Sequence, residues 1–390
     1  MIARDESTHD RGTVTVDLVG DCPIRTWGLE PAERYRRLTA RLGVTFGARD
    51  AAAGVVLVRA DAVLEEKVLA ALVDRPGVAL TVSGGDELLA VHVAAADASA
   101  WRGRLLASPD AAAARDAGLD AVDAAELAGT YDEALRKRAV PYALLLTPET
   151  LDAAEGAMFG GAYKGVTDFV TKHVWPRGAR AVTHWAAERR IAPNTVTTVS
   201  GLCVLAAMYL FWHGWMLTGL AFAWGMTFLD TVDGKLARVT LTSSPFGNVF
   251  DHGIDLIHPP FWYWAWVVGC GAGAFGDSVA LVLWIVIGGY VAGRLLEGIF
   301  LAGFGFEMHA WRPIDSKFRL ITARRNPNLA ILTLFSLAGA PAAGLVAVAV
   351  WTVVSSLFHV AQIVQAYAVR LGGGTVSSWM AEPIETTAQQ

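Results

Sequence analysis

The second half of the chain is dominated by long apolar runs that are separated by short polar or glycine-containing loops. The apolar runs are Pro193–Trp212, Trp215–Leu229, a run after Asp255, Val279–Leu301, and two runs within Leu329–Val369 that Gly339-Ala340-Pro341 divides. Each run is near the length of about 20 residues that a helix needs to cross the core of a bilayer. We therefore expect residues 193–370 to form an α-helical integral membrane domain of six transmembrane helices.

The first 150 residues show a different pattern, in which short apolar runs alternate with amphipathic segments. The runs expected to form strands are Val14–Val19, Val55–Val58, Val78–Val82 and Leu88–Ala94. The segments expected to form helices are Pro31–Leu42, Ala62–Val73 and Ala121–Ala139. Ser83–Asp86, which contains two glycines, is expected to be a hairpin turn between two strands. This alternation predicts a soluble α/β domain over residues 1–150.

The segment 151–192 joins these two parts and mixes basic residues with aromatic and aliphatic ones. Such a mixture favours an amphipathic arm that lies at the membrane surface, where anionic lipid headgroups would attract it. Trp175-Pro176 is expected to break this arm into two pieces. A plain soluble linker helix is the alternative. Residues 371–390 form a polar C-terminal tail.

The distribution of lysine and arginine predicts the orientation in the membrane. The segments 163–190, 235–238 and 312–325 are rich in these residues, whereas the intervening short loops have none. Basic loops stay on the cytoplasmic side. We therefore expect an integral protein of the inner or plasma membrane with both termini in the cytoplasm.

Overall composition narrows the classes of protein further. Hydrophobic residues make up 54% of the chain, and the net charge of −5 gives no reason to expect nucleic-acid binding. The three cysteines are scattered and form neither a metal-binding spacing nor a disulfide framework. The polar N-terminus lacks the apolar core of a signal peptide, so an internal helix is expected to direct insertion.

Four aspartates within Asp230–Asp255 carry the strongest chemical signal. Asp230 and Asp233 share one face of a helix, and Asp251 and Asp255 share one face of the next. Ser244-Pro245 is expected to open that second helix, with the serine as its cap and the proline as its first residue. If the two helices pack together, the four carboxylates meet and repel one another unless divalent cations neutralise them. Oxygen-only ligands point to magnesium, manganese or calcium. A solvated charged turn is the alternative, but the apolar flanks make unpaired carboxylates costly there.

The full spacing is D-x2-D-G-x2-A-R-x8-G-x3-D-x3-D, and it resembles the signature of the CDP-alcohol phosphotransferase family. The resemblance implies transfer of a substituted phosphoryl group from a CDP-alcohol donor to an alcohol acceptor, with release of CMP. It implies two Mg²⁺ or Mn²⁺ ions held by the four aspartates, with Asp255 also the general base. The residues implied to bind the CDP-alcohol are Gly234, Ala237, Arg238, Gly247, Asn194 and Thr197. A membrane-bound homodimer is also expected.

Further polar residues of the membrane domain are candidates for binding the acceptor or a phosphate. They are Arg294, Lys317, Arg324 and Arg325. Guanidinium groups are well suited to binding phosphate. Two alternatives explain the same residues: an ion pair between Arg294 and Glu297, and a basic loop that only sets the orientation of the chain in the membrane. His258 is expected to be a core histidine. His359 and Gln362 are weaker candidates for lining the same cavity.

The first domain resembles a shortened sugar-phosphate nucleotidyltransferase. The segment VVLVRADAVL is similar to a strand that ends in a metal-binding aspartate, here Asp61. The glycine-rich loop that would cradle nucleotide phosphates is missing, because VGDCPIRTW has no glycine-arginine pattern. We therefore expect a degenerate, inactive domain that serves as a scaffold or in dimerisation.

Three functions remain open from the sequence. The first is phospholipid synthesis, with CDP-diacylglycerol or a related lipid as donor. The second keeps this chemistry but uses a polyol phosphate, such as inositol phosphate, to make a soluble phosphodiester, because some relatives fuse a cytidylyltransferase to such a phosphotransferase. The third is an ion channel or transporter that uses the carboxylates as an ion site, which leaves the glycine and Ala-Arg positions unexplained.

Overall fold

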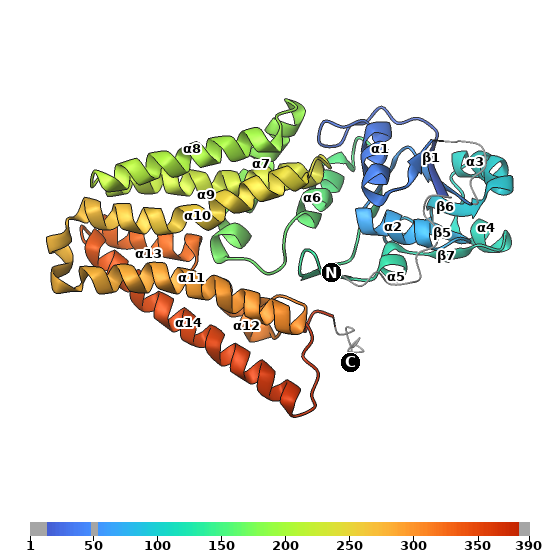
Figure 1. The fold of residues 1–390 in the computed structure, drawn as a ribbon. Coiled ribbons are helices and arrows are strands. Elements are labelled where there is room, and N and C mark those ends of the chain that lie inside the picture. The colour runs from blue at the N-terminus through green and yellow to red at the C-terminus, as the bar shows by residue number, and fades with distance from the viewer. Residues whose placement is uncertain (1–13, 48–53, 382–390) are drawn as a thin grey trace, which may run out of the picture.

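The computed structural model describes residues 14–47 and 54–381, which form an α/β domain at one end of the molecule and a bundle of long helices at the other (Figure 1). The main strands of the α/β domain are β1 (Val14–Val19), β2 (Thr45–Phe46), β3 (Gly54–Arg59), β5 (Val78–Thr81), β6 (Leu88–Ala94) and β7 (Asp120–Val122). They form one six-stranded sheet in the order β2-β1-β3-β6-β5-β7. β6 runs antiparallel to both of its neighbours, whereas β1, β2 and β3 are parallel.

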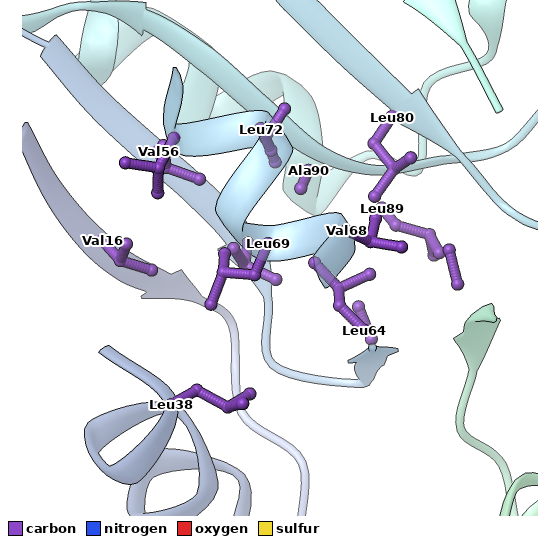
Figure 2. Packing of buried hydrophobic residues seen from close by; sticks show 14 of the residues in the cluster. Val16, Leu38, Val56, Leu64, Val68, Leu69, Leu72, Leu80, Leu89 and Ala90 are labelled. Atoms are coloured by element: carbon purple, nitrogen blue, oxygen red, sulfur yellow. The ribbon is translucent and has the colours of Figure 1, made fainter. Parts of the chain in front are cut away.

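Helices cover this sheet and close its core. They are α1 (Pro31–Leu42), α2 (Glu66–Asp74), α3 (Ala98–Leu106), α4 (Ala111–Asp116) and α5 (Ala124–Ala128). Figure 2 shows α2 with Leu69 and Leu72 turned toward Val56 and Ala90 of the sheet. Trp101 and Leu105 of α3 belong to a second buried cluster. The sheet is therefore buried by apolar contacts, as its continuous runs of valine and leucine require.

Most strands of this domain agree with the sequence analysis, but two helix assignments were wrong. Ala62–Val73 was expected to be one helix and is instead a short strand, β4 (Ala62–Leu64), followed by α2, because the first three residues pair with β10 (Ala143–Leu145). Ala121–Ala139 was also expected to be a helix. The chain there forms β7, α5 and a hairpin of β8 (Tyr131–Asp132) and β9 (Lys137–Arg138).

The local cause of the second error lies at the ends of α5. Asp123 caps the helix by accepting hydrogen bonds from the N–H groups of Ala125 and Glu126, both at 2.8 Å. Gly129, at a φ of 67°, follows the helix after five residues. The alanine-rich composition therefore favoured a longer helix than the cap and the pairing of β7 with β5 allow.

The connecting arm contains α6 (Leu151–Gly161), a π-helical turn (Val170–Val174) and α7 (Pro176–Glu188). The expected break at Trp175-Pro176 is confirmed, since α7 begins at the proline. The N-terminal domain packs on this arm through Trp27, whose ring stacks on Phe159 at 5.7 Å and whose backbone N–H donates to Glu155 at 2.7 Å. The α/β domain is thus fixed against the helical part of the molecule.

The helical domain has six main helices: α8 (Pro193–Trp212), α9 (Met216–Val239), α10 (Pro245–Cys270), α11 (Val279–Phe304), α13 (Arg325–Leu337) and α14 (Pro341–Leu371). A short α12 (Pro313–Phe318) lies in the loop before α13. In the part of the chain that the structure describes, three helical stretches are long and apolar enough to cross a membrane: Pro193–Trp212, Gly273–Phe304 and Pro341–Leu371. Large apolar side chains such as Trp284 and Leu334 face outward, as expected for a membrane domain.

The two helices that carry the motif extend beyond the apolar runs, as the sequence analysis expected. α9 continues past the apolar run that ends at Leu229 to Val239, and α10 begins at Pro245, ahead of the apolar run after Asp255. The four aspartates are therefore part of the helices and not of the loop between them. The expected division near Gly339-Ala340-Pro341 is confirmed, because α13 ends at Leu337 and α14 begins at Pro341.

Candidate active site

The carboxylates of Asp230, Asp233 and Asp251 meet where the end of α9 faces the beginning of α10. One carboxylate oxygen from each of the three lies within 4.8 Å of the others. The local sequence sets this geometry, because Asp230 and Asp233 are one helical turn apart. Ser244 caps α10 by accepting a hydrogen bond from the N–H of Gly247 at 3.0 Å. Pro245 is the first residue of that helix.

The hydrogen bonding of Asp233 leaves one oxygen of this cluster without a partner. Its side chain is buried, and one oxygen accepts a hydrogen bond from the Thr197 hydroxyl at 2.5 Å. The other oxygen, Oδ1, is buried without a hydrogen-bond partner. A buried carboxylate oxygen with no partner, next to two further carboxylates, fits the all-oxygen ligand set of a hard divalent cation.

Asp255 lies on the same side of α10 but in a different environment. Its carboxylate is paired with Arg325, the first residue of α13, and Arg325 also pairs with Asp230. Arg325 was considered only as a phosphate-binding candidate. The structure places it between two motif aspartates, so it bridges the three-carboxylate cluster and Asp255.

A cavity of about 630 Å³ lies beside these carboxylates, between the helical domain, the arm and the N-terminal domain. Its lining includes Asp230, Asp251, Asp255, Gly234, Ala237, Arg238 and Arg325. Three other residues expected to bind the CDP-alcohol, Asn194, Thr197 and Gly247, lie outside this lining. Thr197 instead supports Asp233. A Cβ atom at Gly247 would lie 2.8 Å from Asn194 Oδ1, so the glycine permits the close approach of α8 and α10.

A second charged cluster occupies another wall of the cavity. Glu297 pairs with Arg294 at 3.1 Å and also with Arg324, and His309 contacts it at 3.3 Å. The ion pair between Arg294 and Glu297 that the sequence suggested is therefore present, and Arg324 joins it. His309 lies in a short 3-10 turn between α11 and α12, where burial lowers its pKa to about 3, so its imidazole is neutral at neutral pH.

Several further residues considered in the sequence analysis do not line the cavity. Lys317 is exposed and does not line the cavity. His258 is buried and bonds to the Ile254 carbonyl at 2.7 Å, as expected of a core histidine, although its Nε2 has no partner. His359 and Gln362 were expected to line the cavity and do not. They are buried beneath it, where the His359 ring lies 5.3 Å from the ring of His309.

The sequence analysis did not assign several residues that line the cavity. They are Arg136, Lys164, Asp168, Lys235 and Arg319. Burial alone would raise the pKa of Asp168, but hydrogen bonds from the Thr171 N–H and from Asn326 hold it below its usual value. Lys164, Lys235 and Arg319 each lie in a segment rich in lysine and arginine, and this was their sequence signal. Nothing in the pattern around Arg136 points to a site.

Asp61 in the N-terminal domain presents the opposite arrangement to the motif aspartates. Arg59 donates to both of its carboxylate oxygens, at 2.9 and 2.7 Å, and also pairs with Glu87. Both oxygens of Asp61 are therefore already engaged within the protein.

A helical domain with three stretches apolar enough to cross a membrane and a cluster of three carboxylates that could hold a metal ion is the class of structure that fold and site define. Residues 190–354 match the family model described as CDP-alcohol phosphatidyltransferase. The resemblance to this family is thereby confirmed for the segment that carries the aspartate motif.

Curated relatives agree with this assignment. The chain is 29% identical to a bifunctional IPC transferase and DIPP synthase of Rubrobacter xylanophilus over 209 residues, which cover 53% of this chain and 45% of that protein. It is 34% identical to cholinephosphotransferase 1 of Danio rerio over 26% of this chain and 28% of the relative. It is 42% identical to archaetidylinositol phosphate synthase of Pyrococcus horikoshii over 17% and 35%, respectively. The chain thus spans less than half the length of these relatives.

Proposed function

We propose that this protein is a membrane CDP-alcohol phosphotransferase. It transfers a substituted phosphoryl group, phosphatidyl from CDP-diacylglycerol in the main hypothesis, to an alcohol acceptor and releases CMP in phospholipid synthesis. The observation that carries the proposal is the group of three carboxylates within 4.8 Å of one another. Two of them, Asp230 and Asp251, line the cavity of about 630 Å³, and all three lie within the segment that matches the family model.

The proposed metal centre uses Asp230, Asp233 and Asp251, with Asp255 completing it. The bare Oδ1 of Asp233 and the close approach of three carboxylates support two ions, Mg²⁺ or Mn²⁺. Such ions, when bound, neutralise the charge of the pyrophosphate and hold its oxygens.

The remaining roles fall to side chains around this centre. Asp255 is proposed to remove the proton from the acceptor hydroxyl, because its carboxylate stands at the edge of the cluster and lines the cavity. Arg325, which pairs with both Asp230 and Asp255, fixes the carboxylate of the base in place. Arg238, whose Nε has no partner, is proposed to bind the pyrophosphate, with Gly234 and Ala237 leaving room for the cytidine end.

The proposed topology retains six spans and cytoplasmic termini. The six main helices support this number, although α13 has only 13 residues. The N-terminal domain then faces the cytoplasm and opens the cavity toward soluble nucleotides. A homodimer in the inner or plasma membrane completes this proposal.

We propose further that the first domain is a degenerate nucleotidyltransferase without catalysis of its own. The pairing of Asp61 with Arg59 supports this, because both oxygens of the aspartate that would hold a metal already accept hydrogen bonds from the arginine. The absence of a glycine-rich phosphate-binding loop from its sequence also supports a domain without catalysis.

A polyol phosphate acceptor is the second candidate. The name of the Pyrococcus horikoshii relative, archaetidylinositol phosphate synthase, and the arginines of the cavity favour it. A channel or transporter has no comparable support.

The decisive experiment is an assay of the purified full chain with CDP-diacylglycerol, Mg²⁺ or Mn²⁺ and a panel of acceptors that includes glycerol 3-phosphate, serine and inositol 1-phosphate. CMP release with one acceptor is the expected result and identifies it. If no acceptor supports CMP release from CDP-diacylglycerol or from a soluble CDP-alcohol, the proposed function is wrong.

A further inference from the structure

The N-terminal domain sends a small hairpin into the wall of the cavity. β8 and β9 pair with each other and stand apart from the six-stranded sheet. Arg136, in the turn between them, lines the cavity beside Lys164 of the arm. A residue of the α/β domain is thus part of the lining that contains the aspartate motif.

Contacts with the connecting arm and with the C-terminal stretch fix this hairpin. The N–H of Gly165 donates to the Leu135 carbonyl at 2.9 Å, and the Lys137 ammonium donates to the carbonyl of Gly161. Arg138 donates to the backbone carbonyls of Trp379 and Met380 near the C-terminus, at 3.1 and 2.7 Å.

The close packing of the arm on the hairpin depends on Gly165. A Cβ atom there would lie 2.8 Å from the Cα of Lys137 and 2.6 Å from its Cβ. Because these are backbone and near-backbone atoms, they cannot move aside as the end of a flexible side chain could. Even alanine would therefore displace the turn that carries Arg136.

Arg136 also occupies an unusual backbone conformation. Its φ of 48° is in the left-handed region, which the last residue of such a turn adopts and which glycine or asparagine usually fills. An arginine held there is a strained placement, and strained residues gather at functional sites.

The charges around Arg136 are not balanced by the protein. Arg136 pairs with Glu307, but its Nε is buried and has no partner. Among the residues that the structure describes, Lys164, Arg238 and Arg319 line the same cavity without forming an ion pair. Arg319 also has two buried nitrogens without partners. This end of the cavity therefore presents cationic groups with unused hydrogen-bond donors.

We propose that Arg136 and Lys164 form a subsite for a phosphate group of the polar substrate, so that the N-terminal domain takes part in substrate binding. A guanidinium with a free donor and an adjacent ammonium match the charge and hydrogen-bond acceptors of a phosphate. The phosphate belongs either to the pyrophosphate of the CDP-alcohol or to a phosphorylated acceptor. The identity of these ligands rests on the proposed function.

Binding to the full-length protein in detergent tests this proposal without turnover. Titration calorimetry with CDP, cytidine and inositol 1-phosphate would be compared between the unsubstituted chain and Arg136→Gln. We expect affinity for one phosphate-bearing ligand to fall about tenfold, the scale of a lost charge-assisted hydrogen bond, and affinity for cytidine to stay the same. A loss for CDP assigns the subsite to the donor, and a loss for inositol 1-phosphate assigns it to the acceptor.

Three further variants separate binding from structure. Glu307→Gln breaks the same ion pair but keeps Arg136, so it should bind phosphate ligands as well as the unsubstituted chain or better. Gly165→Ala should reproduce the loss seen in Arg136→Gln, because it displaces the turn. Arg75→Gln, which breaks a surface pair with Asp120 in the same domain, should change nothing.

The proposal fails if Arg136→Gln binds both phosphate ligands normally, if Glu307→Gln shows the same loss, or if the unsubstituted protein binds neither ligand. Absence of CMP release by a protein that binds phosphate through Arg136 would instead contradict the proposed function alone.

Discussion

Two acidic sites in this chain differ in how their charges are compensated. In the N-terminal domain, Arg59 donates to both oxygens of Asp61 and also pairs with Glu87. Between α9 and α10, Arg325 pairs with Asp230 and Asp255, but an oxygen of Asp233 is buried without a partner. An unpartnered carboxylate oxygen beside two further carboxylates favours an added cation, whereas both oxygens of Asp61 are already engaged. The comparison therefore supports the proposed metal site in the helical domain and a structural role for Asp61.

The largest expected effect comes from removing an uncompensated carboxylate. Asp233→Asn should weaken Mn²⁺ binding and lower CMP release by about 10²–10³-fold, the scale of losing one preorganised electrostatic group. Raised Mn²⁺ should restore part of the activity. Asp61→Asn is the matched control and should leave both quantities unchanged. Equal losses in the two variants would remove the distinction between the sites.

The next effect concerns the proposed base. Asp255→Asn keeps the shape of the side chain but removes its basic oxygen, so CMP release should fall by at least ~10²-fold. Binding of metal and CDP should survive better than turnover, in contrast to Asp233→Asn. Near-normal CMP release by Asp255→Asn at saturating metal would show that the base lies elsewhere.

A substitution at Arg59 in the N-terminal domain should change stability and not activity. Arg59→Gln leaves Asp61 and Glu87 facing each other, and the free energy of unfolding of the N-terminal domain should fall by about 2 kcal/mol. This is below the 3–5 kcal/mol scale for a fully buried pair, because both carboxylates are about one-third exposed. Hydrogen exchange of β1 and β3 in the full chain would measure it. Arg59→Gln with Glu87→Gln should recover part of the loss; unchanged protection in the single variant would contradict this account.

The smallest expected effect is a pH dependence of phosphate binding through Lys164. Its side chain is open to the cavity, yet burial lowers its pKa, and the nearby charges of Arg136 and Arg238 lower it further, while Glu307 and Asp230 oppose them. As pH rises through this lowered pKa, the ammonium loses its charge. The affinity for a phosphate ligand should therefore decline by no more than about fivefold, and at a lower pH than for an ordinary lysine.

Lys164→Arg keeps the charge at all these pH values and serves as the control. Its binding profile should be flat where that of the unsubstituted chain falls. Calorimetric titration with the phosphate ligand identified through Arg136 provides the measurement. A decline of the same size in both proteins would assign the pH dependence to another group.

The sequence by itself determined the features that depend on local periodicity. The one-turn spacing of Asp230 and Asp233, the serine-proline start of α10 and the apolar runs each act within a few residues along the chain. They were therefore sufficient to predict the carboxylate motif, the membrane character of the second half and most strands of the first. They failed for Ala121–Ala139, where helix propensity competes with a capping aspartate and with pairing to a distant strand.

Only the tertiary structure decided which distant charges meet. Arg325 reaches Asp255 and Asp230 across sequence separations of 70 and 95 residues, and Arg136 reaches Glu307 across 171. No periodic pattern encodes such contacts, because they arise from how whole helices and domains pack. The motif therefore fixed the positions of the aspartates along the chain. Packing decided which aspartates pair with arginine and which one has an oxygen without a partner. Packing also decided that a hairpin of the first domain shares their cavity.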